Sequence, residues 1–422
     1  MSRERRRLEV LADWPGLEGP SLMGHVDATP ARGKEIFSFE FSPTYLASTA
    51  ARSVDPGLRL VSGPQYPGRN QDTFGFLLDA SPDRWGRVLL QRREALRARE
   101  TGRRERQLTE LDYLLGVFDG HRMGALRFRV DGGPFLDDDR DLASPPWTSL
   151  RELEHASREL EKPGAERSAS WSKWLRLLVA PGRSLGGARP KASVIDEKGR
   201  LWIAKFPSER DTWNVGAWEA VAHQLARAAG VDVPEARCQR FGRGHHTFLA
   251  RRFDRTDRGG RLHFASAMTM LERRDGEEGA SYLDLASFLI QNTEAVAGVL
   301  EQLWRRIVFS VCISNVDDHL RNHGFLMLTG RNGGWGLAPA YDLNPVATGD
   351  GLTLNISETD NAQDLSLVLQ VAEHFRVKGS RAESIVSEVR KAVRGWPKAA
   401  RALALSRSEQ ERMAPAFRLA DD

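Results

Sequence analysis

Cysteine, lysine and long hydrophobic runs are all scarce in this sequence of 422 residues. The two cysteines, Cys238 and Cys312, lie far apart in apolar surroundings. This argues against a disulfide framework or a zinc cluster, and we expect buried free thiols. No apolar run approaches the roughly 20 residues that a membrane-spanning helix needs. The basic segment Met1–Arg7 is not followed by an apolar stretch, so we expect no signal peptide, a cytoplasmic protein and no membrane partner.

Arginine is the usual cation of this chain, because only nine of its 61 basic residues are lysine. A lysine inside an apolar segment is therefore informative. Hydrophobic residues make up 41% and charged residues 28% of the chain, which predicts a globular protein long enough for two or three domains. The net charge of +4 permits a polyanionic partner but does not establish one.

Strand patterns dominate the first part of the sequence and helical patterns the last part. Ile36–Phe41 and Met123–Val130 alternate as strands do, and Arg84–Arg99 predicts a basic helix with Ser81 as its cap. We expect a small-residue loop at Pro163–Ser172. Strands followed by helices indicate a two-lobed α+β fold.

The densest cluster of polar side chains is Ser314–Asn322, between a predicted helix and a predicted strand. Burying these groups without partners would cost several kcal/mol, so the segment is either a solvated turn or a functional site. Asp317 precedes Asn322 by five residues, which is the spacing of a kinase catalytic loop, although this spacing alone is weak evidence. Asp342 follows a short apolar strand further along the chain.

Four features that precede this cluster each allow two interpretations. The Gly-Gly pair in Arg183–Lys191 could bind phosphate through its backbone N–H groups or form an ordinary turn. Lys205 lies inside an apolar strand, where its ammonium group needs an anionic partner unless it points to water from a sheet edge. Glu219 lies on the apolar side of a predicted helix and could pair with Lys205 or lie at the surface. Similarly, Arg251–Arg255 is either a solvated strand end or a segment between two lobes, whose main chain binds adenine.

The order of these elements is the order that phosphoryl transfer on a kinase fold requires: glycine-rich loop, strand lysine, helix glutamate, loop aspartate, loop asparagine and strand-end aspartate. Lys205 would contact the α- and β-phosphates of ATP. Asn322 and Asp342 would provide oxygen ligands for Mg²⁺. Asp317 would accept or orient the proton of the substrate hydroxyl.

These residues resemble the HipA-type toxin kinases of bacterial toxin–antitoxin modules. The matching motifs are S-L-G-G-A-R-P-K, W-I-A-K-F-P, R-F-D-R, V-D-D-H-L-R-N and P-A-Y-D-L, together with the N-terminal segment F-G-F-L-L-D-A-S-P-D-R-W-G-R-V-L-L. The resemblance covers about residues 20–395 and implies an α+β fold, with an α/β N-terminal domain before a kinase domain whose C-terminal part is mainly helical. The domains expected on this basis are 1–130 (N-terminal domain), 131–149 (linker), 150–400 (kinase domain, with ATP loop and hairpins at 181–255 and helical lobe at 256–400) and 401–422 (C-terminal helix or tail).

The resemblance also implies the activity: an ATP- and Mg²⁺-dependent serine/threonine protein kinase that arrests growth as a toxin, with aminoacyl-tRNA synthetases among the family's targets. The implied partner is a small helix-turn-helix antitoxin (HipB-like), through which operator DNA is mainly bound. Ser184 matches the serine that family members autophosphorylate, and a phosphate there would repel the phosphates of ATP. The implied ATP-binding residues are Gly186, Gly187, Ala188, Arg189, Pro190, Lys191, Lys205, Arg251, Arg252, Phe253, His319, Leu320, Arg321, Asn322, Tyr341 and Asp342.

Two positions depart from the family pattern. The family varies at the position of Arg189, and Arg321 replaces the usual lysine of the catalytic loop. Arginine keeps the cation with a different geometry, and we expect activity to survive both changes. We expect His319 and Arg321 to act as scaffold or phosphate contacts, and Asp318 not to be the catalytic acid of its pair.

Two other functions compete with the kinase. A metal-dependent phosphohydrolase could use Asp317, Asp318, His319, His323 and Asp342, with both histidines facing one metal if the segment is helical. The loop-like context instead indicates that His323 is a loop histidine with satisfied partners. An inactive kinase-fold protein could act as an antitoxin-bound corepressor, which the basic helix Arg84–Arg99 would suit, although such a run is more often a solvated face.

Overall fold

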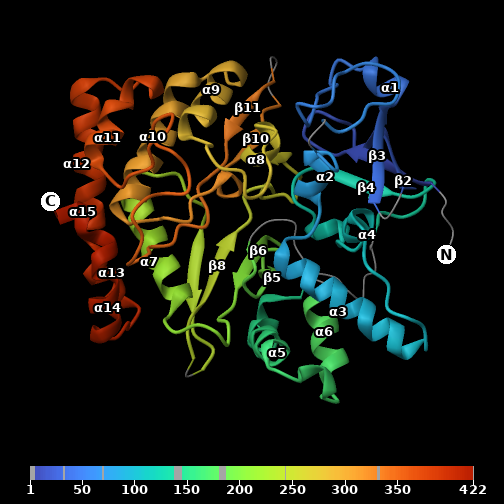
Figure 1. Cartoon of the computed structure of the whole chain (residues 1–422), viewed down its shortest axis with the longest axis horizontal. Helices are drawn as coiled ribbons and strands as arrows, with labels where there is room; N and C mark the ends of the chain where they lie inside the picture. The colour runs from blue at the N-terminus through green and yellow to red at the C-terminus, as the bar shows by residue number, and fades with distance from the viewer. Residues whose placement is uncertain are drawn as a thin grey trace. The chain divides into compact units, whose positions relative to one another are not determined.

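The computed structural model of the chain describes residues 5–31, 34–68, 71–136, 145–179, 187–242, 244–329 and 333–421. The chain forms two compact units, and each unit consists of two segments. The first unit comprises Met1–Glu209 and Arg252–Ala265, and the second comprises Arg210–Arg251 and Ser266–Asp422. Figure 1 labels the helices and strands of both units.

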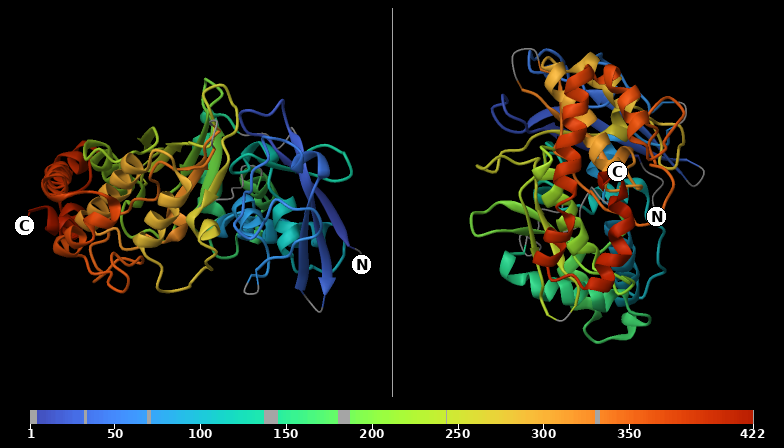
Figure 2. Two further views of the ribbon diagram at one scale, coloured as in Figure 1. Left: turned by 90° about the horizontal axis from the view of Figure 1, so that it is seen from above. Right: turned by 90° about the vertical axis from the view of Figure 1, so that its left-hand side faces the viewer.

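An antiparallel sheet with the strand order β3-β2-β1-β4 lies at the centre of the N-terminal part of the first unit. The strands are β1 (Arg6–Ala12), β2 (Ser21–Ala31), β3 (Lys34–Phe41) and β4 (Leu126–Arg129), and Figure 2 shows the first three as neighbouring strands in blue. Val10, Val26 and Phe39 lie on one face of this sheet and are fully buried. Gly24 lies on the same face, where an added Cβ atom would come within 2.3 Å of the Glu40 carbonyl oxygen.

The first unit also contains α-helices. They are α1 (Pro43–Leu46), α2 (Gly75–Ala80), α3 (Arg84–Glu100), α4 (Glu110–Leu115), α5 (Leu150–Glu161) and α6 (Trp171–Val179). The predicted helix at 84–99 is confirmed, but the prediction of its cap was wrong. Asp83 rather than Ser81 caps α3, because the Asp83 carboxylate accepts a hydrogen bond from Gly86 N at 2.8 Å.

Helix α6 was not predicted, because the loop expected at 163–172 covers its first residues. Trp171, Leu175 and Leu178 recur at helical spacing and are buried, and α6 packs against α3 and α5. The predicted hairpin that follows is confirmed as β5 (Lys191–Ile195) and β6 (Leu201–Lys205). Its register places Lys191 directly opposite Lys205.

The second unit is mainly helical. Its helices are α7 (Val215–Ala228), α8 (Ala267–Met270), α9 (Tyr282–Asn292), α10 (Val296–Cys312), α11 (Leu365–Gln370), α12 (Gly379–Val393), α13 (Trp396–Ala402), α14 (Arg407–Met413) and α15 (Arg418–Asp421). Its antiparallel hairpins pair β7 (Ala236–Gln239) with β8 (Thr247–Arg251) and β10 (Gly324–Met327) with β11 (Trp335–Leu337). Strand β9 (Phe264–Ser266) lies where the chain passes from the first unit to the second.

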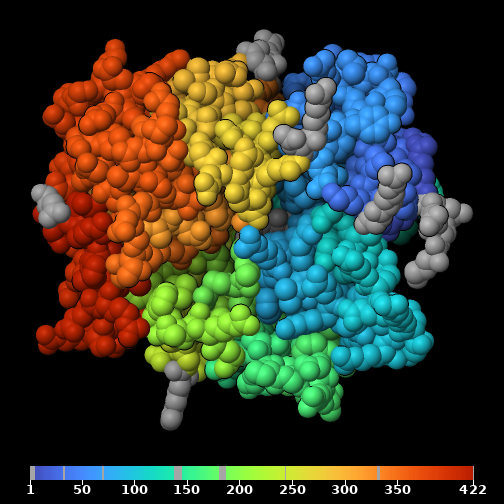
Figure 3. All heavy atoms as spheres, viewed as in Figure 1, coloured from blue at the N-terminus to red at the C-terminus, as the bar shows by residue number. Residues whose placement is uncertain are grey.

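Helix α10 is the central element of the second unit, and it is buried on all sides from Leu303 to Cys312. Trp304, Ile307, Val308 and Val311 are fully buried, and the helix packs against α9, α12 and α15. The C-terminal helices, red in Figure 3, cover part of the surface of this unit. Because α10 is held from several sides, it gives the polar segment that follows Cys312 a rigid start.

Helices and antiparallel sheets together confirm the predicted α+β class. The predicted boundaries at residues 130, 149 and 400 stay predictions. Among the described residues no helix is long and apolar enough to cross a membrane.

Candidate active site

The polar segment 314–322 begins with a sharp change of direction after α10. Ser314 is buried and has φ = +50°, and its hydroxyl donates to Ala416 O at 2.9 Å. The backbone N–H of Asn315 donates to Ser310 O at 2.8 Å, and its side-chain Oδ1 accepts from Asn344 N at 3.1 Å. These bonds exclude the solvated-turn interpretation for the start of the segment.

The two consecutive acids of the segment lie in opposite environments. Asp317 is exposed, whereas Asp318 is only 3% exposed. Asp318 Oδ2 accepts hydrogen bonds from the hydroxyls of Tyr282 (2.5 Å) and Ser310 (3.1 Å), and its Oδ1 lies 2.9 Å from Nε2 of His323. Asp318 is therefore a structural acid, and Asp317 is the one of the two acids that is accessible to solvent.

The surroundings of Asp318 shift the pKa of both partners of its short hydrogen bond. Burial alone would raise the pKa of Asp318, but His323 and the hydrogen bonds from Tyr282 and Ser310 outweigh it and hold that pKa below its ordinary value. Burial and the neighbouring Asp318 charge raise the pKa of Tyr282 well above its ordinary value. The pair therefore consists of a carboxylate acceptor and a phenol donor at neutral pH.

Asn322 is oriented by the backbone of Asp317. Its Nδ2 donates to Asp317 O at 2.8 Å, and His319 N donates to the same carbonyl at 3.1 Å. Leu320–Asn322 form one 3-10 turn that leads into β10. Because Nδ2 is the donor in this bond, Oδ1 is the atom of the Asn322 amide that can bind a cation.

The segment that contains Asp342 is hydrogen-bonded to this loop. The Tyr341 hydroxyl donates to Arg321 O at 2.8 Å, and Val346 N donates to Ser314 O at 3.2 Å. Asp342 has φ = +60°, a conformation that is costly for a residue with a Cβ atom. Strained backbone of this kind is concentrated at functional sites.

The side chain of Arg321 binds a residue outside the loop. Its guanidinium forms an ion pair with Asp275 at 2.6 Å, and its carbonyl accepts the Tyr341 bond. His319 is half-buried, and the scaffold or phosphate-contact role expected of both residues stays a prediction.

Of the predicted glycine-rich loop, Ser184 and Gly186 lie outside the described residues. Gly187 and Ala188 are exposed, and among the described residues, chain neighbours aside, no atom lies within 4 Å of the position that a Cβ of Gly187 would take. Arg189 is half-buried, and Pro190 O accepts from Phe206 N at 2.9 Å.

Lys191 has a partner that the sequence did not reveal. The Lys191 and Asp83 side chains are 3% and 2% exposed, and Lys191 Nζ lies 3.0 Å from Asp83 Oδ2. The same Nζ donates to Gly187 O at 3.0 Å. Lys191 thus connects the end of the glycine-rich loop to the cap of α3, within the first unit.

Lys205 and Glu219 lie in different units. Lys205 is the half-buried last residue of β6 in the first unit. Glu219 lies on α7 in the second unit and is 5% exposed, which excludes the interpretation of a surface glutamate. The ion pair between them stays a prediction.

The segment Arg251–Arg255 is not a solvated strand end, because Arg252 is 2% exposed. Arg251 N donates to Glu235 O at 2.7 Å, and Arg252 N donates to Leu201 O at 3.0 Å. Phe253 is half-buried, with its ring 5.8 Å from that of Phe264. The adenine-binding role of the segment stays a prediction.

A divalent cation of the Mg²⁺ type suits the residues of the loop. Asn322 and Asp342 offer neutral and anionic oxygen atoms, which are the ligands that Mg²⁺ prefers. Among the described residues no group of three or more His, Cys, Asp or Glu side chains could hold a metal ion. The hydrolase alternative placed His319 and His323 on one metal in a helical segment, and that arrangement is not present, because both histidines lie outside an α-helix and Asp318 is paired internally.

Sequence reasoning missed Tyr282, Ser310 and Asp83 as partners of the site. Neither their spacing nor their surroundings in the sequence distinguishes them from ordinary helix and cap residues. His323 is a buried loop histidine whose Nε2 lies 2.9 Å from Asp318 Oδ1. Its Nδ1 is buried without a hydrogen-bond partner among the described residues, so the expectation of satisfied partners is not met at that nitrogen.

The fold and this loop define a kinase-like α+β protein, and comparison with known proteins gives the family. The model of the HipA-like C-terminal domain matches residues 183–396, just over half of the chain, and the chain belongs to that family. In Haemophilus influenzae, a protein named "Putative kinase" is 29% identical over 187 residues, covering 39% of this chain and 53% of its own length. In Sinorhizobium fredii, a protein with a similar name is 32% identical over 206 residues, which cover 44% of this chain and 48% of that protein's length. The chain thus spans about half the length of the curated relatives it matches.

One solved structure matches almost the whole chain. It is the HipA, HipB and operator DNA complex of a Shewanella oneidensis toxin–antitoxin system, with a TM-score of 0.64, 18% identity and coverage of 98% of this chain and 95% of that chain. The expected family and the kinase-like α+β fold are thereby confirmed.

Proposed function

We propose that this protein is a serine/threonine protein kinase that transfers the γ-phosphate of Mg-ATP. The observation that supports it best is the loop in which Asp317 is exposed while Asn322 is bonded to the Asp317 carbonyl. This is the arrangement that phosphoryl transfer needs, with one acid open to a substrate hydroxyl and a nearby amide oxygen for the metal. The family membership and the names of its relatives point in the same direction.

The proposed reaction assigns a role to each part of the site. The substrate hydroxyl oxygen bonds to the γ-phosphorus, the bond from that phosphorus to the β,γ-bridging oxygen breaks, and Asp317 accepts or orients the released proton. Asn322 and Asp342 would hold Mg²⁺, whose positive charge would offset the charge on the phosphates. Lys205, supported by Glu219, contacts the α- and β-phosphates. The remaining nucleotide contacts are assigned to Gly186–Lys191, Arg251–Phe253, His319–Arg321 and Tyr341.

We further propose that the kinase is a growth-arresting toxin controlled by a helix-turn-helix antitoxin and by autophosphorylation of Ser184. The support is the motif resemblance and the matching structure, which is described as HipA with HipB and operator DNA. A phosphate on Ser184 would lie two residues before Gly186 and repel the phosphates of ATP. Aminoacyl-tRNA synthetases are the first protein substrates to test.

The test is phosphate transfer from labelled ATP in the presence of Mg²⁺. Asp317→Asn removes the proton acceptor, and we expect transfer to fall by about a hundred-fold or more. The control is Glu383→Gln, which alters an exposed acid on α12 of the same unit and should leave transfer unchanged. Equal labelling by Asp317→Asn would refute the catalytic assignment. Tight Mg-ATP binding without any transfer by the wild type would favour the corepressor instead.

A further inference from the structure

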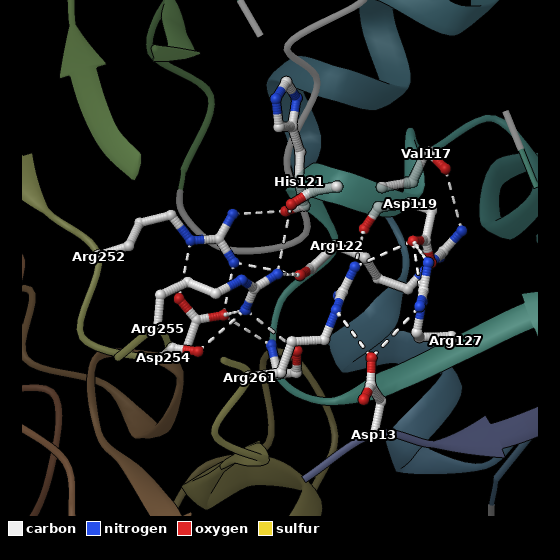
Figure 4. A network of polar contacts seen from close by, with 12 residues as sticks. Asp13, Val117, Asp119, His121, Arg122, Arg127, Arg252, Asp254, Arg255 and Arg261 are labelled. Carbon is white, nitrogen blue, oxygen red and sulfur yellow. Dashed lines mark hydrogen bonds and ion pairs between the residues drawn. The ribbon is translucent and has the colours of Figure 1, made fainter. Parts of the chain in front are cut away.

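The predicted adenine-binding segment continues into a network of buried charges in the first unit (Figure 4). Asp254 is completely buried, and several hydrogen bonds of this network converge on it. It accepts hydrogen bonds from Nε (2.8 Å) and Nη2 (2.5 Å) of Arg252, from Nη1 of Arg255 (2.6 Å) and from Gly124 N (2.8 Å). Four donors on one carboxylate leave no room for solvent.

The same two arginines bind a turn that lies about 130 residues earlier in the chain. Arg252 donates to His121 O at 2.5 Å and to Arg122 O at 3.2 Å. Arg255 donates to Arg122 O at 2.8 Å, Gly124 O at 3.1 Å and Gly120 O at 3.3 Å. The carbonyl groups of the turn 119–124 therefore hold the segment 252–255 by accepting hydrogen bonds from its arginines.

A second layer of ion pairs surrounds this contact. Arg261 lies 3.0 Å from Asp119 Oδ2, and Arg127 lies 2.6 Å from the same oxygen. Arg127 also donates to Asp13 at 3.3 Å, which connects the layer to the residue after β1. Leu262 N donates to Asp254 O at 3.0 Å, so both ends of the loop 254–262 are fixed.

The charges of the network depend on one another. Four arginines (127, 252, 255 and 261) face three aspartates (13, 119 and 254), and the backbone carbonyls compensate the excess cation. Burial lowers the pKa of Arg255 to about 9, with Asp254 acting in the opposite direction. Burial would raise the pKa of Asp254, but Arg252 and Arg255 hold it well below its ordinary value. Removing one member leaves its partners charged and buried, which is strongly unfavourable.

We propose that the side chains of Asp254, Arg252 and Arg255 position the segment for nucleotide binding, and that the turn 119–124 holds the adenine-binding segment through them. The nucleotide contact assigned to Arg252 is then made by its main chain, because its guanidinium is bonded to Asp254 and to the turn. This inference rests on the proposed function. A backbone segment that is fixed before the ligand arrives loses less conformational freedom on binding, so affinity for ATP rises without any new contact to ATP. The N-terminal part of the chain would then contribute to the nucleotide site without touching the nucleotide.

The test uses the full-length chain with a matched pair of variants. Arg255→Lys keeps the charge but cannot serve all the carbonyls of the turn. Arg258→Lys makes the same change at an exposed position three residues later. We expect Arg255→Lys to raise KM for ATP, and Kd for a fluorescent ATP analogue, about ten-fold with little change in kcat. Arg258→Lys should match the wild type.

A purely structural role predicts a different result: fewer folded molecules and a lower apparent kcat, with KM unchanged. Asp13→Asn alters a half-buried residue of the second layer of ion pairs. This milder variant keeps the test valid if Arg255→Lys fails to fold. We expect it to raise KM about two- to three-fold. Unchanged KM and Kd in the folded variants would overturn this inference and leave the kinase proposal intact. A wild-type protein that binds no ATP would overturn both.

Discussion

Asp317 and Asp318 are adjacent in the chain, yet one carboxylate is exposed and the other is enclosed by Tyr282, Ser310 and His323. The enclosed acid ties the loop to α9 and α10 and to the start of β10. Its neighbour is thereby turned outward and kept in place. Substitution of Asp318 should therefore lower the stability of the fold, whereas substitution of Asp317 should lower activity and leave stability almost unchanged.

The first prediction concerns this pair. Asp318→Asn removes the negative charge and replaces one carboxylate oxygen, which faces either His323 or both hydroxyls of Tyr282 and Ser310, with an NH2 donor. We expect the free energy of unfolding to fall by about 3–5 kcal/mol. Asp317→Asn alters an exposed residue and should change it by less than about 0.5 kcal/mol. Urea unfolding of both variants measures this. Similar losses in the two variants would contradict the distinction.

The second prediction uses the strained backbone of Asp342. Glycine adopts φ = +60° without the Cβ penalty, so Asp342→Gly should raise the free energy of unfolding by about 1 kcal/mol. The same change removes the proposed Mg²⁺ ligand, and phosphate transfer should disappear. Asp342→Asn keeps the strain and serves as the control, with lower Mg²⁺ affinity and no gain in stability. A less stable Asp342→Gly protein would show that the side chain stabilises its own conformation.

The third prediction concerns Lys191 and Asp83. Lys191→Met leaves the Asp83 carboxylate buried without its ammonium partner, and we expect a loss of about 3–5 kcal/mol in the free energy of unfolding. Asp83→Asn should also be destabilising, although asparagine still caps α3. The loss of unfolding free energy in the double variant should be smaller than the sum of the two single losses, and the difference should be at least about 1 kcal/mol. Additive losses would mean that the ion pair does not stabilise the fold.

The fourth prediction concerns pH. Burial lowers the pKa of His263 to about 3, far below the value of about 6.5 in an unfolded chain. The unfolded state therefore binds a proton first, so the contribution of His263 to stability is complete above about pH 6.5 and is lost as the pH falls toward 3. The slope should be about 1.4 kcal/mol per pH unit.

The pH dependence is measured as the free energy of unfolding at several values between pH 7.5 and 5. His263→Phe removes the ionisable group and should flatten this slope. His374→Gln changes an exposed histidine and should leave the slope as it is. An unchanged slope in His263→Phe would assign the acid sensitivity to other groups.

Local patterns predicted most of the elements that position the site. The hairpin β5–β6, the helices α3, α7, α9, α10 and α12, and strand β10 follow from near-neighbour periodicity and caps. Strand β1 was missed because it begins with the adjacent residues Arg6 and Arg7, which belong to the basic segment at the start of the chain. The cap of α3 was misassigned because Ser81 and Asp83 are both good caps, and only the fold shows which side chain reaches Gly86 N.

By itself, the sequence determined the order and type of the candidate site residues and the family that they resemble. Only the tertiary structure decided which of two adjacent acids faces solvent, and that Lys191 and Arg252 are paired internally with Asp83 and Asp254. The reason is physical: burial and ion pairing depend on groups brought together from distant positions. Tyr282 lies 36 residues before Asp318, and Gly124 lies 130 residues before Asp254. No local stretch of sequence contains both partners.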